Sequence, residues 1–395
     1  MLSYEAALRQ VIKTIVPLPA QRKNLVDAAG QFLNETVTAR WDMPRWDNSA
    51  MDGFAMAECS LTTGVPLEIV GSSYAGHPYP GHLEAGAAIR ITTGAPLPAG
   101  ADTVVPLEEC HEENGRLMIQ QQVKKGQHVR YQGEEFRADE ELLAPGTPLH
   151  SGAIGLLAAA GVKQVKVTVR PRVAIFSTGD ELVELGQQPG PGQIVNSNLQ
   201  YLVARVRECD CKPVPLGIGE DQDADLTRLI EQARQCDLIV STGGVSVGEK
   251  DLVQQTLGQL GFVRKFWKVS IKPGKPVLFG TLQNKPFFGL PGNPAATAAT
   301  FELFVRPALR KLSGCSDPLT PLFRVRLAEE IETSGSRQLF LWGQLRNLAG
   351  QMNFVPSLHQ GSGQNRGLQN AQALLPVPAG KTVLKKGTIV AIMLL

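Results

Sequence analysis

The feature that most restricts the fold of this 395-residue chain is an alternation of apolar runs and helical periodicity between residues 172 and 312. Short, continuously apolar runs predict buried strands at 173–176, 214–218, 237–240 and 286–289. Helical spacing of apolar residues predicts helices at 198–208, 224–235, 251–260 and 295–312. Buried strands that alternate with helices are typical of a parallel sheet covered on both faces. We therefore predict a doubly wound parallel α/β domain over residues 171–315.

The segments on either side of this region have a different pattern of apolar residues. Residues 4–16 predict an amphipathic helix with Ser3 as its N-cap. Short apolar runs broken by Gly, Pro and Asn predict a mostly β domain over 43–137 and a small C-terminal β domain over 316–395. We expect residues 1–42 and 138–170 to form a mixed α/β linker domain into which the first β domain is inserted. The expected fold class is α/β with additional β domains.

The charge balance and the cysteines narrow the functional classes. The chain has 39 basic and 37 acidic side chains, whereas a protein that coats nucleic acid has a large basic excess. Its six cysteines form neither a CxxC pair nor a zinc pattern with histidines, as is typical of reduced thiols in the cytoplasm. The sequence shows no signal peptide and no apolar run of membrane-spanning length. We expect a cytoplasmic protein that binds neither nucleic acid nor a membrane.

Three polar segments follow the predicted strands, and ligands of doubly wound sheets bind beyond the carboxyl ends of strands. The first segment runs from Ser177 to Glu181. Its Thr178 and Gly179 suit a phosphate or the edge of a pterin, and the carboxylates of Asp180 and Glu181 suit a metal ion. The alternative is an ordinary strand-to-loop turn that Asp180 caps.

The second segment, Ser241–Asp251, is rich in glycine. The pair Gly243 and Gly244 allows backbone N–H groups to approach an anion closely, and the helix predicted behind them offers its positive end. Glu249 stands where the lysine of a P-loop belongs, and no Ser or Thr follows Lys250, which excludes a Walker-type NTPase. The alternative is a Gly-rich turn capped by the last residue of the segment.

The third segment places Lys272 and Lys275 on a rigid Pro-Gly turn. Two ammonium groups on one side of such a turn suit a phosphate or another oxyanion, and a surface turn with solvated lysines is the alternative. A fourth segment, 289–294, joins a strand to a helix, and its prolines can shape a pocket wall. In the N-terminal half, 48–53 and 91–96 are polar turns that carry no chemistry when taken singly.

Together, these segments resemble the MoeA / gephyrin E-domain family in order and spacing. The matching motifs are Asn-Ser-Ala-Met-Asp-Gly (48–53), Thr-Gly-Ala-Pro (93–96), Ser-Thr-Gly-Asp-Glu-Leu (177–182), Gly-Gly-Val-Ser-Val-Gly (243–248), Ile-Lys-Pro-Gly-Lys-Pro (271–276) and Gly-Leu-Pro-Gly-Asn-Pro (289–294). Each motif is weak alone, but the six stand in register over nearly the whole chain.

The resemblance implies a homodimer of elongated, multi-domain subunits whose α/β domain binds molybdopterin. It implies an enzyme of molybdenum cofactor biosynthesis that takes molybdate and adenylylated molybdopterin. With a divalent cation, usually Mg²⁺, such an enzyme cleaves the adenylate and releases molybdenum cofactor and AMP. The resemblance also implies an active cleft shared between subunits, and other molybdenum cofactor biosynthesis proteins as further partners.

The resemblance assigns roles motif by motif. Asp52 and Thr93 reach the cleft from the partner subunit. Glu181, Asp221 and Asp251 surround the metal and, with Asp52, form the catalytic set. The lysines hold phosphate and molybdate, and the prolines form the wall. The implied substrate-binding residues are Thr93, Thr178, Gly179, Gly243, Gly244, Ser246, Lys272, Lys275, Pro291, Pro294 and Ser362.

The chain departs from the family pattern at two places. Gly133-Glu134-Glu135 has a glutamate where the family often has an aspartate, and Trp342 stands where the family often has an arginine at the molybdate site. Because neutral groups alone stabilise a dianion poorly, we expect another cation to compensate. Arg366, in the Gly-flanked loop after Ser362, is the first candidate, ahead of Arg346 and Arg337.

Two other functions stay open. A gephyrin-like scaffold that binds peptides would be favoured by a fused adenylating domain and a long linker, and this sequence shows neither. A molybdopterin adenylyltransferase-type enzyme would share the α/β domain but would lack the N-terminal β region that carries Asp52.

Overall fold

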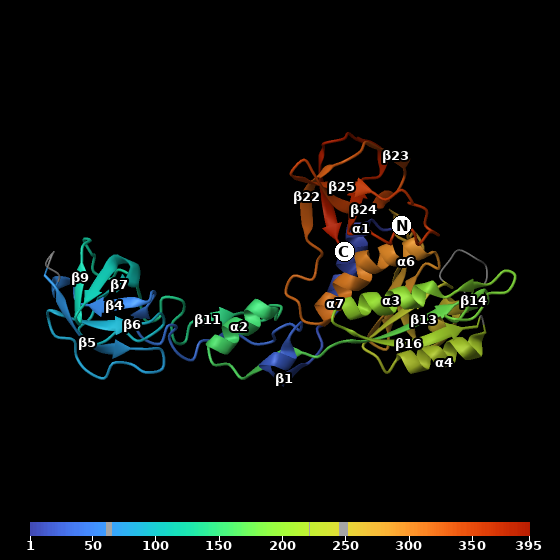
Figure 1. The fold of residues 1–395 in the computed structure, drawn as a ribbon. Coiled ribbons are helices and arrows are strands. Elements are labelled where there is room, and N and C mark those ends of the chain that lie inside the picture. Colours follow the sequence, from blue (N-terminus) through green and yellow to red (C-terminus); the bar gives the residue numbers. More distant parts are fainter. Residues whose placement is uncertain (61–64, 221, 245–251) are drawn as a thin grey trace.

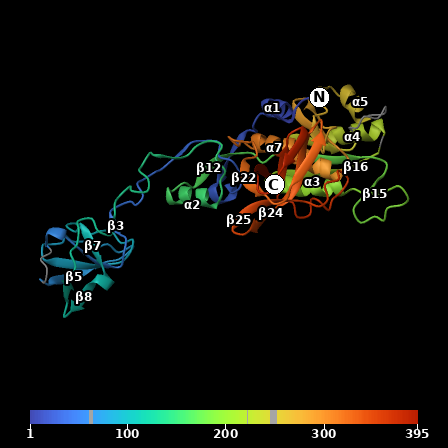
Figure 2. The same cartoon turned by 90° about the horizontal axis from the view of Figure 1, so that it is seen from above.

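The computed structural model describes residues 1–60, 65–220, 222–244 and 252–395. The molecule is elongated, with a β body at one end and the α/β domain and a C-terminal β barrel at the other (Figure 1). A narrow linker separates the two ends in both views (Figure 2). The expected class, multi-domain α/β with additional β domains, is confirmed. The domain boundaries stay a prediction.

The α/β domain is built on a six-stranded sheet in the order β16-β13-β17-β21-β20-β18. Its strands are β13 (Arg172–Thr178), β16 (Lys212–Gly219), β17 (Leu238–Thr242), β18 (Phe262–Trp267), β20 (Leu278–Leu282) and β21 (Lys285–Leu290). Strands β16, β13, β17 and β21 are parallel, as predicted. The sequence analysis missed β18 and β20, which extend the sheet antiparallel. A two-residue turn with positive φ at Gln283 and Asn284 joins β20 to β21 and makes this pair a hairpin.

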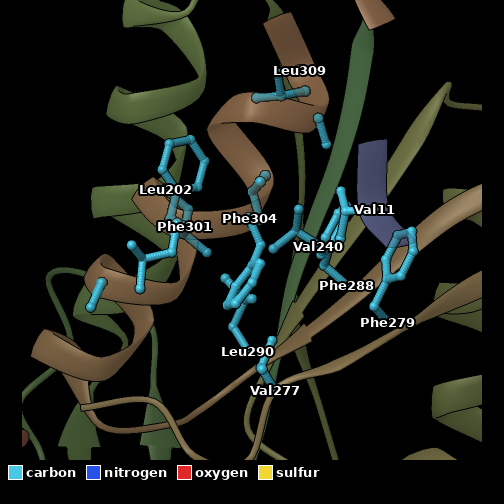
Figure 3. Packing of buried hydrophobic residues seen from close by; sticks show 14 of the residues in the cluster. Val11, Leu202, Val240, Val277, Phe279, Phe288, Leu290, Phe301, Phe304 and Leu309 are labelled. Carbon is cyan, nitrogen blue, oxygen red and sulfur yellow. The ribbon is translucent and has the colours of Figure 1, made fainter. Parts of the chain in front are cut away.

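Helices cover both faces of this sheet, so the doubly wound prediction holds. They are α3 (Ser197–Glu208), α4 (Asp223–Ala233), α5 (Leu252–Gln259), α6 (Pro294–Thr300) and α7 (Arg306–Leu312). Alternate residues of β13 point to opposite faces, as the period of a strand requires. Val173 and Ile175 pack with α3, α6 and α7, whereas Ala174 and Phe176 pack with α4 and α5. Figure 3 shows part of the first core, where Leu202, Phe301 and other side chains of this cluster lie against the sheet.

The single helix predicted over 295–312 is wrong in one respect, because a π-helical turn, η4 (Phe301–Val305), separates α6 from α7. Pro307 has no backbone N–H to donate to the carbonyl four residues earlier, so the regular ladder cannot continue through it. The turn carries Glu302, which is buried and bonds Arg205 of α3 at 2.7 Å and Arg306 at 3.1 Å. This ion pair fixes α3 against the helix that follows the cavity wall.

The predicted N-terminal helix is α1 (Tyr4–Thr14), and the Ser3 hydroxyl accepts a hydrogen bond from the Ala6 N–H at 3.2 Å. Its buried face includes Tyr4 and Val11, and the Tyr4 ring contacts that of Phe304. The sequence analysis grouped this helix with the linker, but its contacts place it in the core of the α/β domain.

The linker joins chain segments from before and after the β body. Strand β1 (Ala20–Asn24) pairs with β12 (Gln164–Thr168), and β2 (Val37–Thr38) pairs with β11 (Glu141–Leu143). These strands share a core with η1 (Leu25–Ala28) and α2 (Ser151–Ala159). The β body is therefore inserted between two linker segments, which two antiparallel strand pairs hold together.

The β body has a six-stranded sheet in the order β7-β4-β6-β5-β9-β8 and a core of its own that includes Phe54 and Val105. The sheet strands are β4 (Gly53–Met56), β5 (Leu67–Ser73), β6 (Ala87–Ile91), β7 (Thr103–Pro106), β8 (Cys110–Glu113) and β9 (Arg116–Ile119). The remaining elements are β3 (Asn48–Ser49), β10 (Val129–Arg130), η2 (Glu58–Ser60) and η3 (Leu107–Glu109).

The C-terminal barrel closes because β24 pairs with β26 as well as with β25. Its strands are β22 (Leu322–Leu327), β24 (Gln338–Leu348), β25 (Gln351–Pro356), β26 (Ala373–Val377) and β28 (Ile389–Leu394), and β23 (Ile331–Gly335) pairs separately with β27 (Gly380–Leu384). A short strand from the α/β domain, β19 (Ile271–Lys272), joins the barrel sheet in parallel with β24. The predicted lysine turn thus starts on a strand that the barrel holds.

Candidate functional site

A cavity of about 670 Å³ lies at the carboxyl ends of β13, β17 and β21, where a doubly wound sheet binds its ligand. The residues singled out from the sequence that line it are Thr178, Glu181, Gly243, Gly244, Pro291 and Pro294. The other lining residues are Leu182, Ile194, Val195, Asn196, Ser197, Asn198, Thr242, Pro276, Gly292, Asn293, Gly363 and Asn365. Of the residues expected here, Gly179 is buried beside Thr178 but does not line the cavity.

The floor of the cavity rests on a chain of buried hydrogen bonds between strand ends. The Thr242 hydroxyl donates to Ser177 Oγ at 2.9 Å, and Ser177 Oγ donates to Asn196 Oδ1 at 2.9 Å. Asn196 is also the N-cap of α3, since the same oxygen accepts from the Leu199 N–H at 3.3 Å. These contacts tie the ends of β13 and β17 to the first turn of α3.

Two buried side chains of the floor keep unused polar groups. Thr178 Oγ1 and Asn196 Nδ2 have no hydrogen-bond partner among the described residues, although each residue is 2% exposed. A buried polar atom without a partner costs free energy, about 1–3 kcal/mol in mutational data. Both residues line the cavity, so a ligand with complementary polar atoms would satisfy them.

The close approach of β13 to the loop after β17 requires glycine. Gly243 has φ +84° and Gly244 has φ +61°, values that favour glycine. A Cβ on Gly243 would overlap the Thr178 carbonyl oxygen, and one on Gly244 would lie 2.8 Å from Thr178 Oγ1. The glycines therefore let two strand ends meet at the floor of the cavity.

The lysine turn borders the cavity at one edge. Gly274, between the two lysines, has φ +101° and lies so close to α6 that a Cβ would be 2.5 Å from Thr300 Cγ2. Pro276 lines the cavity, but the side chains of Lys272 and Lys275 are exposed and lie outside its lining. Neither ammonium forms an ion pair with any residue that the structure describes. Both are free to meet an anion at the rim.

A barrel loop closes another edge of the cavity. The Ser362 carbonyl accepts a hydrogen bond from the Ala295 N–H at 2.9 Å, and its hydroxyl lies 3.3 Å from Asn293 Nδ2. Asn365 Nδ2 donates to Ser197 Oγ at 3.4 Å. The loop thus docks on the first turns of α6 and α3. Arg366 is exposed on this loop and does not line the cavity.

Trp342 fills an apolar position. It is 1% exposed and packs in the core shared by the barrel and the α/β domain. Gln360 bonds both its backbone groups, at 3.1 Å to the N–H and 2.8 Å to the carbonyl. The residue therefore contributes packing where the family often has a cation.

Part of the expected metal site cannot be placed. Asp221, Asp251 and Ser246 lie outside the described residues. Glu181 is exposed and lines the cavity, and its carboxylate folds over Gly179. Within the ranges that the structure covers, no three His, Cys, Asp or Glu side chains gather as a metal site.

Asp52 and Thr93 form a second polar site in the β body. One carboxylate oxygen of Asp52 accepts hydrogen bonds from the Thr93 N–H at 2.6 Å and the Thr93 hydroxyl at 2.9 Å. Both hydrogen bonds lower the pKa of Asp52, the backbone one more than the side-chain one, so the carboxylate stays ionised. Strand β4, which begins directly after Asp52, lies at the opposite end of the molecule from β13, whose end borders the cavity (Figure 1), so the structure does not bring Asp52 and Glu181 together within one subunit.

A cavity of about 610 Å³ lies close to this pair in the β body. Its lining residues are Met43, Pro44, Asn48, Gly94, Arg130, Glu134 and Glu135. It therefore includes the neighbour of Thr93 and the glutamate that departs from the family pattern. The sequence analysis did not anticipate a role for Arg130 here.

The sequence analysis also missed four asparagines that line the main cavity: Asn196, Asn198, Asn293 and Asn365. A signal existed for two of them. Asn196 and Asn293 directly precede segments with helical periodicity, which is where asparagine caps helices. Helix caps at the ends of buried strands lie beside the ligand in a doubly wound sheet.

In the described part of the chain, no helix is long and apolar enough to cross a membrane.

Family models match most of the chain. Residues 2–161 match the MoeA N-terminal region (domain I and II), residues 174–311 match a probable molybdopterin binding domain, and residues 324–395 match the MoeA C-terminal region (domain IV).

Curated relatives and solved structures agree with these matches. A molybdopterin molybdenumtransferase of Nostoc sp. is 40% identical over 378 residues, 93% of this chain and 86% of the relative. One of Haemophilus influenzae is 36% identical over 80% of this chain and 78% of the relative. The crystal structure of the molybdopterin biosynthesis moeA protein of Pyrococcus horikoshii OT3 superposes with a TM-score of 0.86 at 27% identity, covering 100% of both chains. With its architecture, its cavity and these relatives in accord, the chain belongs to the MoeA family of molybdopterin molybdenumtransferases.

Proposed function

We propose that this chain inserts molybdenum into adenylylated molybdopterin, cleaving the adenylate and yielding molybdenum cofactor and AMP. The observation that carries the proposal is the polar cavity at the strand ends, formed by the segments that match the family motifs. The β body with Asp52 favours this enzyme over an adenylyltransferase, which would lack that region.

The substrate's charged and neutral parts have different neighbours in this site. Lys272 and Lys275, exposed at the rim, would hold phosphate or molybdate as point charges. Thr178, Gly243 and Gly244 would contact the substrate at the floor, and Pro291 and Pro294 would form the wall. Fixed donors around a phosphoryl centre stabilise the charge that develops on it during attack. Ser362 and Arg366 would extend the anion site from the barrel loop.

We propose a divalent cation such as Mg²⁺, held by Glu181 with Asp221 and Asp251. The donor set fits, because Mg²⁺ prefers carboxylate and phosphate oxygens, and Glu181 lines the cavity. The cation would neutralise phosphate charge and act as a Lewis acid. Ser246 would contribute to substrate binding.

We also propose a homodimer with a shared cleft, in the cytoplasm, that acts together with other molybdenum cofactor biosynthesis proteins. Support for the shared cleft comes from the Asp52 carboxylate, which is ionised and hydrogen-bonded to Thr93. Both residues are exposed, and they belong to the β body, which lies far from the α/β domain of the same chain. In a two-fold dimer, the pair of one subunit would face the cavity of the other.

The test of the enzyme is AMP release and cofactor formation from purified protein, molybdate, Mg²⁺ and adenylylated molybdopterin. We expect turnover by the wild type and its loss in Asp221→Ala and Asp251→Ala. Glu329→Ala, which removes an exposed carboxylate from a barrel turn, is the matched control and should keep full activity. Near-normal turnover in both aspartate variants would show that the proposed acidic group is wrong. No turnover by the wild type would refute the proposed reaction.

A further inference from the structure

Asn196 caps a helix and also carries an amide group without a hydrogen-bond partner. It is 2% exposed, it caps α3, and it lines the main cavity. Its position at the junction of strand β13, helix α3 and the cavity floor means that its side chain cannot turn away to solvent.

The hydrogen bonds decide which atom of the amide is left without a partner. The Leu199 N–H can only donate, so the atom opposite it must be the oxygen. The hydroxyl of Ser177 donates to the same oxygen, while Ser177 itself accepts from Thr242. The oxygen is thus fully occupied, and the Nδ2 group keeps two donors with no described partner.

The surroundings of Nδ2 are neutral. Of the described lining residues, Glu181 alone is ionisable. Strands β14 (Leu182–Val183) and β15 (Ile194–Val195) pair in parallel and supply an apolar wall from Leu182, Ile194 and Val195. Thr178 Oγ1, on another lining residue, is a second buried group with unused donor and acceptor capacity.

We propose that Asn196 Nδ2 donates a hydrogen bond to the pyrimidinone edge of the pterin of molybdopterin. This inference rests on the proposed function and assigns the orientation of its substrate. The flat, neutral ring lies on the floor between the apolar wall and Thr178, and the anionic parts point to the lysines at the rim.

Charge explains why the ring, and not a phosphate, occupies the floor. A phosphate there would exchange its hydration for neutral donors beside the carboxylate of Glu181, which is unfavourable. A neutral heterocycle has no such penalty, and its ring acceptors match the amide and hydroxyl donors. Adenine is the competing neutral ring, so the experiment must separate pterin from AMP.

The experiment measures binding of free pterin by its fluorescence, and of AMP with Mg²⁺ by calorimetry, on the full-length protein at pH 8. Asn196→Asp keeps the oxygen that caps α3 and accepts from Ser177, but it replaces the unpartnered donor with an acceptor. Asn196→Ser keeps a neutral capping hydroxyl that is too short to reach the ring. We expect both variants to bind pterin at least about tenfold more weakly than the wild type, with AMP affinity within about twofold.

Two controls isolate the donor. Asn347→Asp makes the same exchange on an exposed barrel residue that does not line the cavity, and it should leave pterin binding within about twofold. Lys275→Ala should show the opposite pattern, with weakened AMP binding and unchanged pterin binding. Thermal unfolding of the Asn196 variants near the wild-type temperature confirms that the cap is retained.

Three results would overturn the inference: no saturable pterin binding by the wild type, wild-type pterin affinity in Asn196→Ser, or parallel loss of AMP affinity, which would place adenine on the floor. These outcomes are separable from the proposed function. A wild type that binds pterin but releases no AMP from adenylylated molybdopterin refutes the reaction alone. An active enzyme whose pterin affinity is indifferent to Asn196 refutes the orientation alone.

Discussion

Replacing Gly243 by alanine should distort the floor of the cavity. The residue has φ +84°, where a side chain costs about 1–2 kcal/mol. The added Cβ would also overlap the Thr178 carbonyl oxygen and lie 3.1 Å from Thr178 Oγ1. Such overpacking costs about 1–3 kcal/mol more, so the sum is about 2–5 kcal/mol. Relief of this strain must move one strand end, since neither backbone has free space.

The matched control is Gly387→Ala in the barrel. Gly387 has φ +82°, and nothing lies within 4 Å of a Cβ built on it, so this variant has only the conformational cost. We expect Gly387→Ala to lose about 1–2 kcal/mol of stability and to keep full activity. Gly243→Ala should lose more stability and most of its substrate affinity.

The measurements are urea unfolding by circular dichroism, binding of pterin and AMP, and AMP release. If Gly243→Ala binds both ligands within about twofold of the wild type, the contact with Thr178 does not shape the cavity. If the two alanine variants are equally destabilised, the contact between Gly243 and Thr178 is not what requires glycine at this position.

Four further predictions use other parts of the molecule. Lys275→Ala should weaken molybdate binding, measured by calorimetry, and Lys275→Arg should not fully restore it, because a guanidinium does not reproduce a compact ammonium; equal affinities would make the lysine a solvated surface residue. Mixed Asp52→Ala and Asp251→Ala subunits should regain activity as heterodimers with one intact site, and no recovery after confirmed subunit exchange, or a monomer in solution, would exclude the shared cleft. Glu302→Gln should destabilise the protein by about 1–3 kcal/mol in urea unfolding, since it removes the buried carboxylate that the half-buried Arg205 and Arg306 share, while Arg205 keeps its ion pair with Glu208; a loss below about 0.5 kcal/mol would contradict this. Thr93→Val removes one of two hydrogen bonds that lower the pKa of Asp52, so this pKa, followed by NMR, should rise toward its ordinary value and still stay below it. Because the folded-state pKa is depressed, the stabilisation that Asp52 gives is present at neutral pH and disappears only as acid titrates the carboxylate in the folded state.

Periodicity predicted the elements that are buried on a regular pattern. The four parallel strands and the helices between them lie within a few residues of their expected bounds, because continuous apolar runs have few other solutions. The strands β18 and β20 escaped because one is mostly exposed along its length and the other contains Gly280. The Gln283–Asn284 turn was the missed signal, and its positive φ values belong to a hairpin.

The site was partly predictable for a different reason. Glycine and proline motifs at strand ends mark tight backbone approaches, so Gly243 and Pro291 could be singled out. For Asn196 only the helix cap was predictable, because its second contact is with Ser177, 19 residues earlier in the chain. The family pattern also suggests replacing Trp342 by arginine, to test whether Arg366 supplies the missing positive charge. Trp342 is buried in a core, so an arginine there would lose packing and bury a charge, and it could not report on Arg366 cleanly.

The pairing of β19 with β24 affects the order in which parts of the chain can fold during synthesis. Lys272 belongs to a two-residue strand whose partner begins at Gln338, and the barrel that contains this partner closes only when β28, ending at Leu394, is in place. On the ribosome, the parallel strands of the α/β domain emerge long before this last strand. The lysine turn therefore lacks its anchor until the barrel strands have been synthesised. A nascent chain that lacks the barrel strands would already have the parallel strands of the cavity floor, but its lysine turn would be loosely held.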